Sequence, residues 1–232
     1  MVVTSNIAEQ LIDSALKLTE ERGWRGLTLP DVAAEAGVSL PDAYSAFPTK
    51  MALLNGFLAR IDRQMLSGEM PDPTDTVRDR LFDVVMRRFD ALEPHKNAIA
   101  VIIDDLPGDP LSALALLPAF GASTAWMLES AGLSASGVWG ALRIKGLAVI
   151  YLTTLRTWLQ DDTVDAARTM AALDRALRRT EMLIQAFPGL SSRRRPWRDR
   201  ASSSTASASG SIRGEGLGEV PPEGALRSDT PS

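Results

Sequence analysis

The stretch from Thr28 to Lys50, TLPDVAAEAGVSLPDAYSAFPTK, constrains the fold more than any other part of the chain. Thr28 and Asp31 have the spacing of a capping box, which satisfies the first amides of a helix. Gly37 should end that helix, because glycine adopts the left-handed backbone conformation at little cost. The stretch therefore predicts a short helix that is closed at both ends.

A second short helix should follow at once. Ser39 and Asp42 repeat the box spacing, and Pro41 lies in the first turn, where its missing N–H costs nothing. The helix is expected to continue to Pro48. Two helices with so short a connection must cross at a steep angle, which is the outline of a helix-turn-helix.

Helical periodicity dominates the rest of the chain, and no convincing alternating strand interrupts it. One helix is predicted from about residue 6 to 23, and Thr49 should cap another that reaches about residue 66. Later helices are predicted at about residues 81–89, 93–105, 111–117, 118–128, 138–160 and 166–187. The helix at 138–160 is apolar nearly all round and should be covered on several sides.

These patterns predict an all-α chain in three parts. Residues 1–66 should form a domain with the helix-turn-helix outline, and 67–187 a larger helical bundle. The family resemblance given below implies DNA binding for the first domain, and ligand binding and dimerisation for the second. From Pro188 the composition turns to Ser, Gly, Pro, Arg and Glu. So few apolar groups cannot offset the entropy of ordering, so 188–232 should be a disordered tail.

Composition favours a soluble protein of the cytoplasm. The 232 residues are 45% apolar and include no cysteine, which excludes disulfides and thiolate metal sites. The N-terminus lacks the pattern of a signal peptide. The longest apolar runs, near 111–122 and 146–155, fall short of the ~20 residues that span a bilayer, so no integral membrane segment is expected.

Charge is unevenly distributed. Residues 1–60 hold five basic and seven acidic side chains, a net charge of −2, whereas 188–232 hold seven basic and five acidic, a net charge of +2. DNA phosphates favour local positive charge, so the first segment should bind non-specific DNA weakly.

The sequence does not predict an enzyme. His95 is the one histidine and follows Pro94 at a helix start, where a surface or capping role is expected. No catalytic set can be built around it, and no phosphate-binding glycine motif occurs. No catalytic residue, metal ligand or cofactor is predicted.

The order of signals in residues 7–66 resembles the TetR family of transcriptional regulators. The first helix ends in ERGW, the second begins LTLPDVAAEAGVS, the third ends in Phe47-Pro48, and Thr49-Lys50 opens a helix with Leu53, Leu54 and Phe57. The resemblance implies a TetR-like fold and a homodimer bound to a double-stranded DNA operator. The third helix would enter the major groove, with two such helices ~34 Å apart in the dimer.

The resemblance also implies roles for single residues. Thr28 would cap the second helix beside the DNA backbone, and Tyr44 and Lys50 would contact phosphates. The side chains that would face base edges are Leu40, Pro41, Asp42 and Ser45. The candidate DNA-binding residues are Thr28, Ser39, Leu40, Pro41, Asp42, Tyr44, Ser45 and Lys50.

Each role has an alternative. Asp42 is either a helix cap or an acceptor for cytosine, and Tyr44 either packs or contacts phosphate. Phe47 is expected to pack. Lys50 is either a phosphate contact or a solvated charge. The sequence also departs from the usual family pattern where bases are read, since Leu40 and Pro41 stand where a basic residue and a glycine are common.

Residues 78–177 resemble a second family, the accessory lipid-binding protein of ubiquinone biosynthesis, which has a TetR-like fold. The segments are RDRLFDVVMRRFDALEPHKNAI, LALLPAF and ALRIKGLAVIYLTTLRTWLQDDTVDAARTMAALDRAL. This resemblance implies a cavity for an isoprenoid lipid and offers an alternative function, a lipid-binding accessory protein whose helix-turn-helix is vestigial.

An apolar small molecule is the ligand expected under either resemblance. Aromatic and Met side chains on the helices of the larger domain could line a cavity or simply form the core. The candidate ligand-binding residues are Phe82, Met86, Trp126, Trp139 and Tyr151. The helices at 138–160 and 166–187 should pair with their symmetry mates in a four-helix bundle. Five arginines around Trp197 are either a solvated tail or a further contact to phosphates or an anionic membrane.

Overall fold

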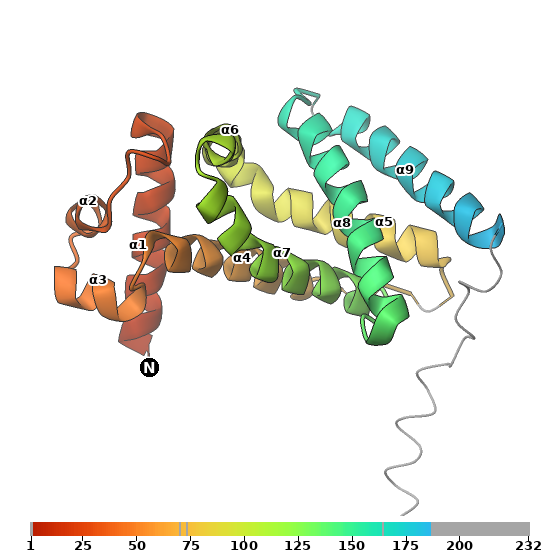
Figure 1. Cartoon of the computed structure of the whole chain (residues 1–232), viewed down its shortest axis with the longest axis horizontal. Helices are drawn as coiled ribbons and strands as arrows, with labels where there is room; N and C mark the ends of the chain where they lie inside the picture. The colour runs from red at the N-terminus through yellow and green to blue at the C-terminus, as the bar shows by residue number, and fades with distance from the viewer. Residues whose placement is uncertain (1, 70, 73, 164, 187–232) are drawn as a thin grey trace, which may run out of the picture. The chain divides into compact units, whose positions relative to one another are not determined.

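The computed structural model describes residues 2–69, 71, 72, 74–163 and 165–186, and within these it contains helices and no strand (Figure 1). The all-α prediction is confirmed, whereas the predicted tail lies outside the described residues. The helices of the described part are α1 (Val2–Arg22), α2 (Leu29–Glu35), α3 (Leu40–Ala46), α4 (Lys50–Leu66), α5 (Val77–Leu92), η1 (Glu93–His95), α6 (Lys96–Asp105), η2 (Leu106–Gly108), α7 (Pro110–Ser130), α8 (Gly137–Leu159) and α9 (Ala167–Ala186).

The predicted caps of the helix-turn-helix are present. The Thr28 hydroxyl accepts a hydrogen bond from the amide of Asp31 at the start of α2, and the Ser39 hydroxyl accepts one from Asp42 at the start of α3. Gly37 between the helices has φ +65°, the left-handed conformation that glycine adopts readily. The helix-turn-helix outline is therefore confirmed, with α3 ending at Ala46 rather than at Pro48.

Two contacts fix the direction of the chain between α3 and α4. The Thr49 hydroxyl accepts from the amide of Ala52 at 3.0 Å. A Cβ on Gly56 would lie 2.6 Å from the Phe47 ring, so this ring packs directly on the α4 backbone. Phe47 thus packs as predicted. The contact explains how a seven-residue helix is held at a defined angle to α4.

A second anchor joins α1, α4 and the start of α6. The Arg60 guanidinium donates to Glu9 at 3.1 Å and to Asp13 at 2.6 Å, and lies 3.3 Å from Nε2 of His95. The His95 ring meets the Phe57 ring edge-on, with centroids 5.4 Å apart. Burial, and then the Arg60 charge, lower the pKa of His95.

His95 occupies the N-cap position of α6, but its side chain makes no capping hydrogen bond. The ring is half-buried beside Arg60 and Phe57 of α4, which the sequence did not predict. Its partners Asp13 and Arg60 lie 82 and 35 positions away in the sequence, so a local pattern could not reveal the contact.

α7 corrects a predicted boundary. It runs unbroken from Pro110 to Ser130 with Pro118 inside it, although proline usually breaks a helix. Pro118 lies on the exposed side, while Leu116 and Phe120 pack against the core on either side of it. Because both halves are held by packing, the helix tolerates the missing hydrogen bond to the Leu114 carbonyl, which water can satisfy.

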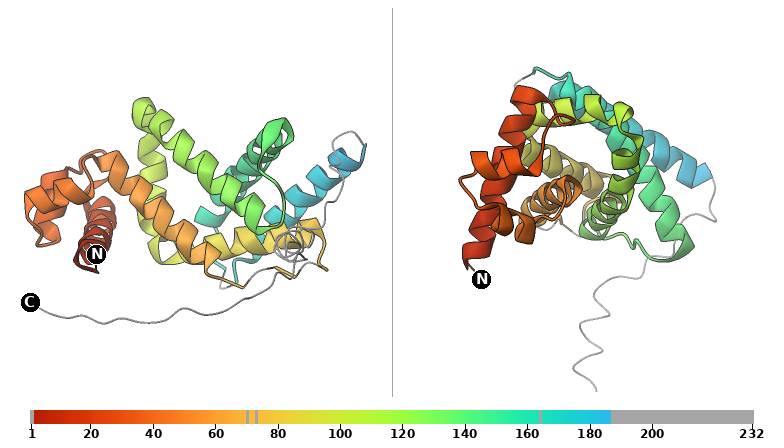
Figure 2. Two further views of the ribbon diagram at one scale, coloured as in Figure 1. Left: turned by 90° about the horizontal axis from the view of Figure 1, so that it is seen from below. Right: turned by 60° about the vertical axis from the view of Figure 1, so that its left-hand side comes forward.

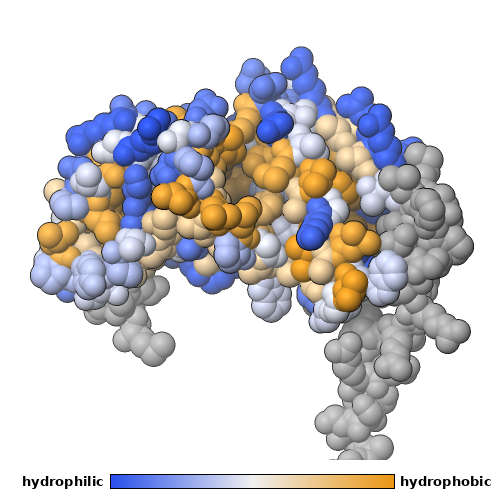
Figure 3. Space-filling model, in the orientation of Figure 1, coloured by the Kyte–Doolittle hydropathy of each residue, from blue (hydrophilic) through white to orange (hydrophobic). Residues whose placement is uncertain are grey.

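α5, α7, α8 and α9 pack against one another in the larger bundle (Figures 1 and 2). α8 packs against α7 and α9 and buries Leu147, Ile150 and Trp158, while part of its surface stays exposed. A stripe of exposed apolar residues runs along its other face. This α8 stripe consists of Val138, Leu142, Val149 and Leu152. Figure 3 shows apolar side chains exposed over α7 and α8.

α7 and α8 are longer than the apolar runs from which the sequence predicted no membrane-spanning helix. By length and composition alone, both helices could cross a bilayer, contrary to the estimate from the apolar runs. Core helices of soluble proteins pass the same test, and α8 contributes several buried residues to the bundle. The expected absence of an integral membrane segment stays a prediction.

A buried polar network joins α4 to the larger bundle. Arg88 of α5 is 1% exposed, and its guanidinium pairs with the carboxylate of Asp62 on α4. Asp62 also accepts from the Ser123 hydroxyl of α7 at 2.6 Å, and Arg88 donates to the Tyr151 hydroxyl of α8 at 3.2 Å. Four helices therefore meet at one ion pair.

Candidate functional site

The face of α3 that the sequence assigns to base reading is exposed. α3 buries Ala43 against the small domain, and the remaining candidates on this helix lie at the surface. Leu40 is 51% and Tyr44 65% exposed. The structure thus places these candidates together on one side of the helix, and their contact with DNA stays a prediction. The exposed candidates of α3 are Leu40, Pro41, Asp42, Tyr44 and Ser45.

The polar groups of this face are bonded within the helix. The Ser39 hydroxyl donates to the Asp42 carboxylate at 2.5 Å while it accepts from the Asp42 amide. The Ser45 hydroxyl donates to the Pro41 carbonyl at 2.8 Å. Asp42 therefore takes part in the cap that the sequence suggested, and its role as an acceptor for cytosine stays a prediction.

An apolar hollow of about 450 Å³ lies between the first turns of α2 and α3. Leu29 and Pro30 contribute from α2, and Leu40, Pro41 and Tyr44 from α3. The two α2 residues were absent from the predicted site. The repeated pattern of TLPD and SLPD could have indicated them, because it puts a Leu-Pro pair in the first turn of each helix.

Lys50 is held against the protein in the free chain. Its ammonium group donates to the Trp24 carbonyl at 2.9 Å and lies 5.0 Å from the centroid of the Trp24 ring. Burial lowers its pKa, against the opposing effect of Asp109 and Asp105. The bond to Trp24 uses one of the three ammonium N–H groups, and the side chain is only partly buried. Contact between Lys50 and phosphate stays a prediction.

The structure does not bring the five candidate ligand residues together. Tyr151 is buried and stacked on Phe89, whereas Trp126 and Trp139 are exposed. Phe82 and Met86 are partly buried on α5. Their role in ligand binding stays a prediction.

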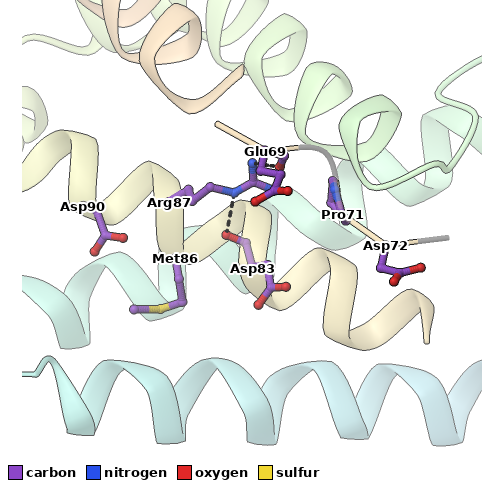
Figure 4. Close-up of a pocket in the computed structure, with 7 residues that line it drawn as sticks. All are labelled: Glu69, Pro71, Asp72, Asp83, Met86, Arg87 and Asp90. Atoms are coloured by element: carbon purple, nitrogen blue, oxygen red, sulfur yellow. Dashed lines mark hydrogen bonds between the residues drawn. The ribbon is translucent and has the colours of Figure 1, made fainter. Parts of the chain in front are cut away.

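Met86 is the candidate that lines a groove of about 740 Å³ between α5 and the segment before it (Figure 4). The other lining residues are mostly acidic, and Arg87 reaches across to donate to the Glu69 carbonyl at 2.5 Å. Such a charged, open groove differs from the apolar cavity expected for a lipid. The lining residues are Glu69, Pro71, Asp72, Asp83, Met86, Arg87 and Asp90.

Comparison with known proteins agrees with this geometry. Residues 11–56 match the family described as bacterial regulatory proteins, tetR family. This segment spans most of α1, all of α2 and α3, and the first part of α4. This segment of the chain is thus similar to the N-terminal domain of that family. No curated protein matches the chain.

Two solved structures share the fold of the chain. A TetR transcriptional regulator from Nitrosomonas europaea is 23% identical with a TM-score of 0.60, over 76% of this chain and 99% of that one. A TetR-family transcriptional regulator from Streptomyces coelicolor is 19% identical with a TM-score of 0.51, over 88% and 98%. At these identities the likeness concerns the fold, which is that of TetR regulators. The resemblance to the ubiquinone accessory protein stays a prediction.

Proposed function

We propose that this protein is a non-enzymatic transcriptional regulator that binds an operator in double-stranded DNA as a homodimer. The observation that carries the proposal is the capped helix-turn-helix, in which α3 presents an exposed face. In helix-turn-helix proteins the second helix lies in the major groove and its N-terminal residues contact base edges. The tetR family match over residues 11–56 supports the same role.

The charge distribution favours specificity over non-specific affinity. Between Thr28 and Lys50 the one basic side chain is Lys50, and it is bound to Trp24. Non-specific binding depends on neutralising phosphates, so few cations on this face mean weak non-specific affinity. Recognition then rests on base contacts and on the spacing of the two α3 helices.

The α8 stripe is the surface that we assign to dimerisation. Its members recur at Val138, Leu142, Val149 and Leu152, which is one face of a helix. A second copy of the chain would cover this face across a two-fold axis, as in a four-helix bundle with α9. A two-fold axis would also present two α3 helices to one DNA site.

Leu152→Arg should convert the dimer to a monomer. A guanidinium in the middle of an apolar two-fold interface would be desolvated and would face its own symmetry mate. We expect the dimer dissociation constant to rise at least ~100-fold, about 2.7 kcal/mol, by analytical ultracentrifugation. Leu66→Arg is the matched control, because Leu66 is 41% exposed on α4 and Leu152 is 47% exposed. A Leu152→Arg protein that stays dimeric at sub-micromolar concentration would remove α8 from the interface.

Selection of DNA from a random pool by the purified full chain tests the function itself. We expect one enriched sequence with two inverted half-sites, whose centres lie about one helical turn or a multiple of it apart. Binding of that duplex should be unaffected by a large excess of unrelated DNA. Failure to enrich any sequence at low salt would contradict the proposed function.

An apolar effector would act through the contacts of α4. The ion pair of the partly buried Asp62 and the buried Arg88 ties α4, which follows the helix-turn-helix, to α5, α7 and α8. A ligand that binds one arrangement of these helices more tightly would shift the population toward it. The spacing of the α3 helices, and with it operator affinity, would then change.

A further inference from the structure

The hollow between α2 and α3 is built from two Leu-Pro pairs. Leu29 and Pro30 are the first two residues of α2, and Leu40 and Pro41 are the first two of α3. Tyr44 stands one turn further along α3 and completes the lining. The helix-turn-helix thus shows an apolar depression at the place where hydrogen-bonding side chains would be expected to read bases.

The neighbouring polar side chains are already committed. The hydroxyls of Ser39 and Ser45 donate to the Asp42 carboxylate and the Pro41 carbonyl. The carboxylate of Asp42 is acidic, accepts from Ser39, and would be repelled by phosphates. These contacts leave the first turn of α3 with few free donors for guanine or adenine.

We propose that the hollow receives the C5-methyl groups of thymines, so that the operator half-site is read mainly through methyl contacts. In the major groove a T·A pair is distinguished by the thymine C5-methyl group beside O4, and apolar side chains contact that methyl. Leu40 and Tyr44 are the exposed large side chains of the lining and would reach the base edges first. This inference rests on the proposed function, because it requires α3 to enter the major groove.

The hollow is an open depression lined from two helices, so more than one base pair would lie against it. Thymines on neighbouring pairs would place their methyl groups along the groove wall beside α2 and α3. The half-site should therefore contain adjacent T·A or A·T pairs opposite the start of α3.

Replacing thymine by deoxyuridine tests the proposal, because this change removes the methyl group and keeps every hydrogen-bonding atom of the pair. The duplex selected by the full chain is synthesised with deoxyuridine at each thymine in turn, and its dissociation constant is measured by fluorescence anisotropy. At the pairs opposite α3 we expect affinity to fall about fourfold for each methyl group removed. At other thymines it should stay unchanged.

A protein variant assigns the methyl contact to the hollow. In Leu40→Ala the deoxyuridine penalty should shrink to less than twofold, because the side chain that contacts the methyl is gone. Leu66→Ala, which truncates an exposed leucine on α4, should keep the full penalty. Circular dichroism spectra of both variants should match that of the parent protein, which serves as the control for folding.

Three results would overturn the inference, and they separate it from the proposed function. Specific binding without any deoxyuridine effect would be consistent with the proposed function as a regulator but would show that the protein does not read methyl groups. A penalty that survives in Leu40→Ala would place the contact outside the hollow. A chain that selects no DNA sequence at all would overturn the inference and the proposed function together.

Discussion

Asp62→Ala should lower the free energy of unfolding by about 3–5 kcal/mol, because it leaves a buried guanidinium without its counter-ion. Arg88 is almost fully buried, and its guanidinium pairs with the Asp62 carboxylate. Burial lowers the pKa of Arg88, but Tyr151 and Asp62 outweigh this effect and hold the pKa above its ordinary value. The arginine therefore stays charged in the folded state, and removing its partner cannot be relieved by deprotonation.

Urea denaturation followed by circular dichroism measures this loss, with two comparisons that isolate its cause. Asp83→Ala removes an exposed acid from α5 and should change stability by no more than about 0.5 kcal/mol. The double variant Asp62→Leu with Arg88→Met removes both charges and should recover most of the loss, since apolar replacement of a buried pair is often neutral. A cost below about 1 kcal/mol for Asp62→Ala would mean that water or another group takes over the guanidinium.

The helix-turn-helix could be predicted from sequence because its signals are local. Thr28, Ser39 and Thr49 each cap a helix through an amide three residues away, and Gly37 supplies the one left-handed position between α2 and α3. Such contacts depend only on the spacing of residues along the chain, so they can be predicted from the sequence. The exposed face of α3 follows from the same periodicity once Ala43 is placed inside.

The sequence predictions failed where tertiary packing, and not the local sequence, determines the structure. Pro118 predicts a break by the local rule, but packing of Leu116 and Phe120 on either side of it holds α7 together. His95 reads as a surface residue until Arg60 and Phe57 are brought against it. The contact of His95 with Arg60 joins residues 35 positions apart, so no local spacing pattern indicates it.

The candidate site divides in the same way. The candidate side chains of α3 lie at the surface, and their contact with DNA stays a prediction. The bond from Lys50 to the Trp24 carbonyl spans 26 positions and was not predicted. The hollow needs Leu29 and Leu40 side by side, which follows only from the crossing of α2 and α3. The buried Arg88 and the partly buried Asp62 have no local signal, because charged residues on amphipathic helices normally face solvent.

Phe89→Ala should also lower the free energy of unfolding by about 3–5 kcal/mol, since it removes a ring from the centre of the larger bundle. Phe89 is 1% exposed. Its ring stacks on Tyr151 of α8 with centroids 5.3 Å apart and on Trp158 with centroids 5.5 Å apart. Truncation leaves a cavity between α5 and α8 and removes both aromatic contacts. Each such contact stabilises the fold beyond the contribution of the buried apolar area.

Phe89→Leu, which keeps an apolar side chain of smaller volume, should cost clearly less than Phe89→Ala in the same urea titration. Phe120→Ala is a second comparison, because its partly buried ring lies 5.8 Å from that of Tyr151 at the edge of the same cluster. It should cost less than the central truncation. Equal losses for Phe89→Ala and Phe120→Ala would show that Phe89 is not the centre of the packing between α5 and α8.

The same variant also distinguishes core from ligand site at Tyr151. A cavity left by Phe89→Ala would be apolar and could bind a small aromatic compound such as benzene. Added benzene should then raise the stability of Phe89→Ala in proportion to its occupancy and leave the parent protein unchanged. Stabilisation of the parent protein would instead mean that an apolar cavity already exists beside Tyr151, which would favour the predicted ligand role of this residue over a purely structural one.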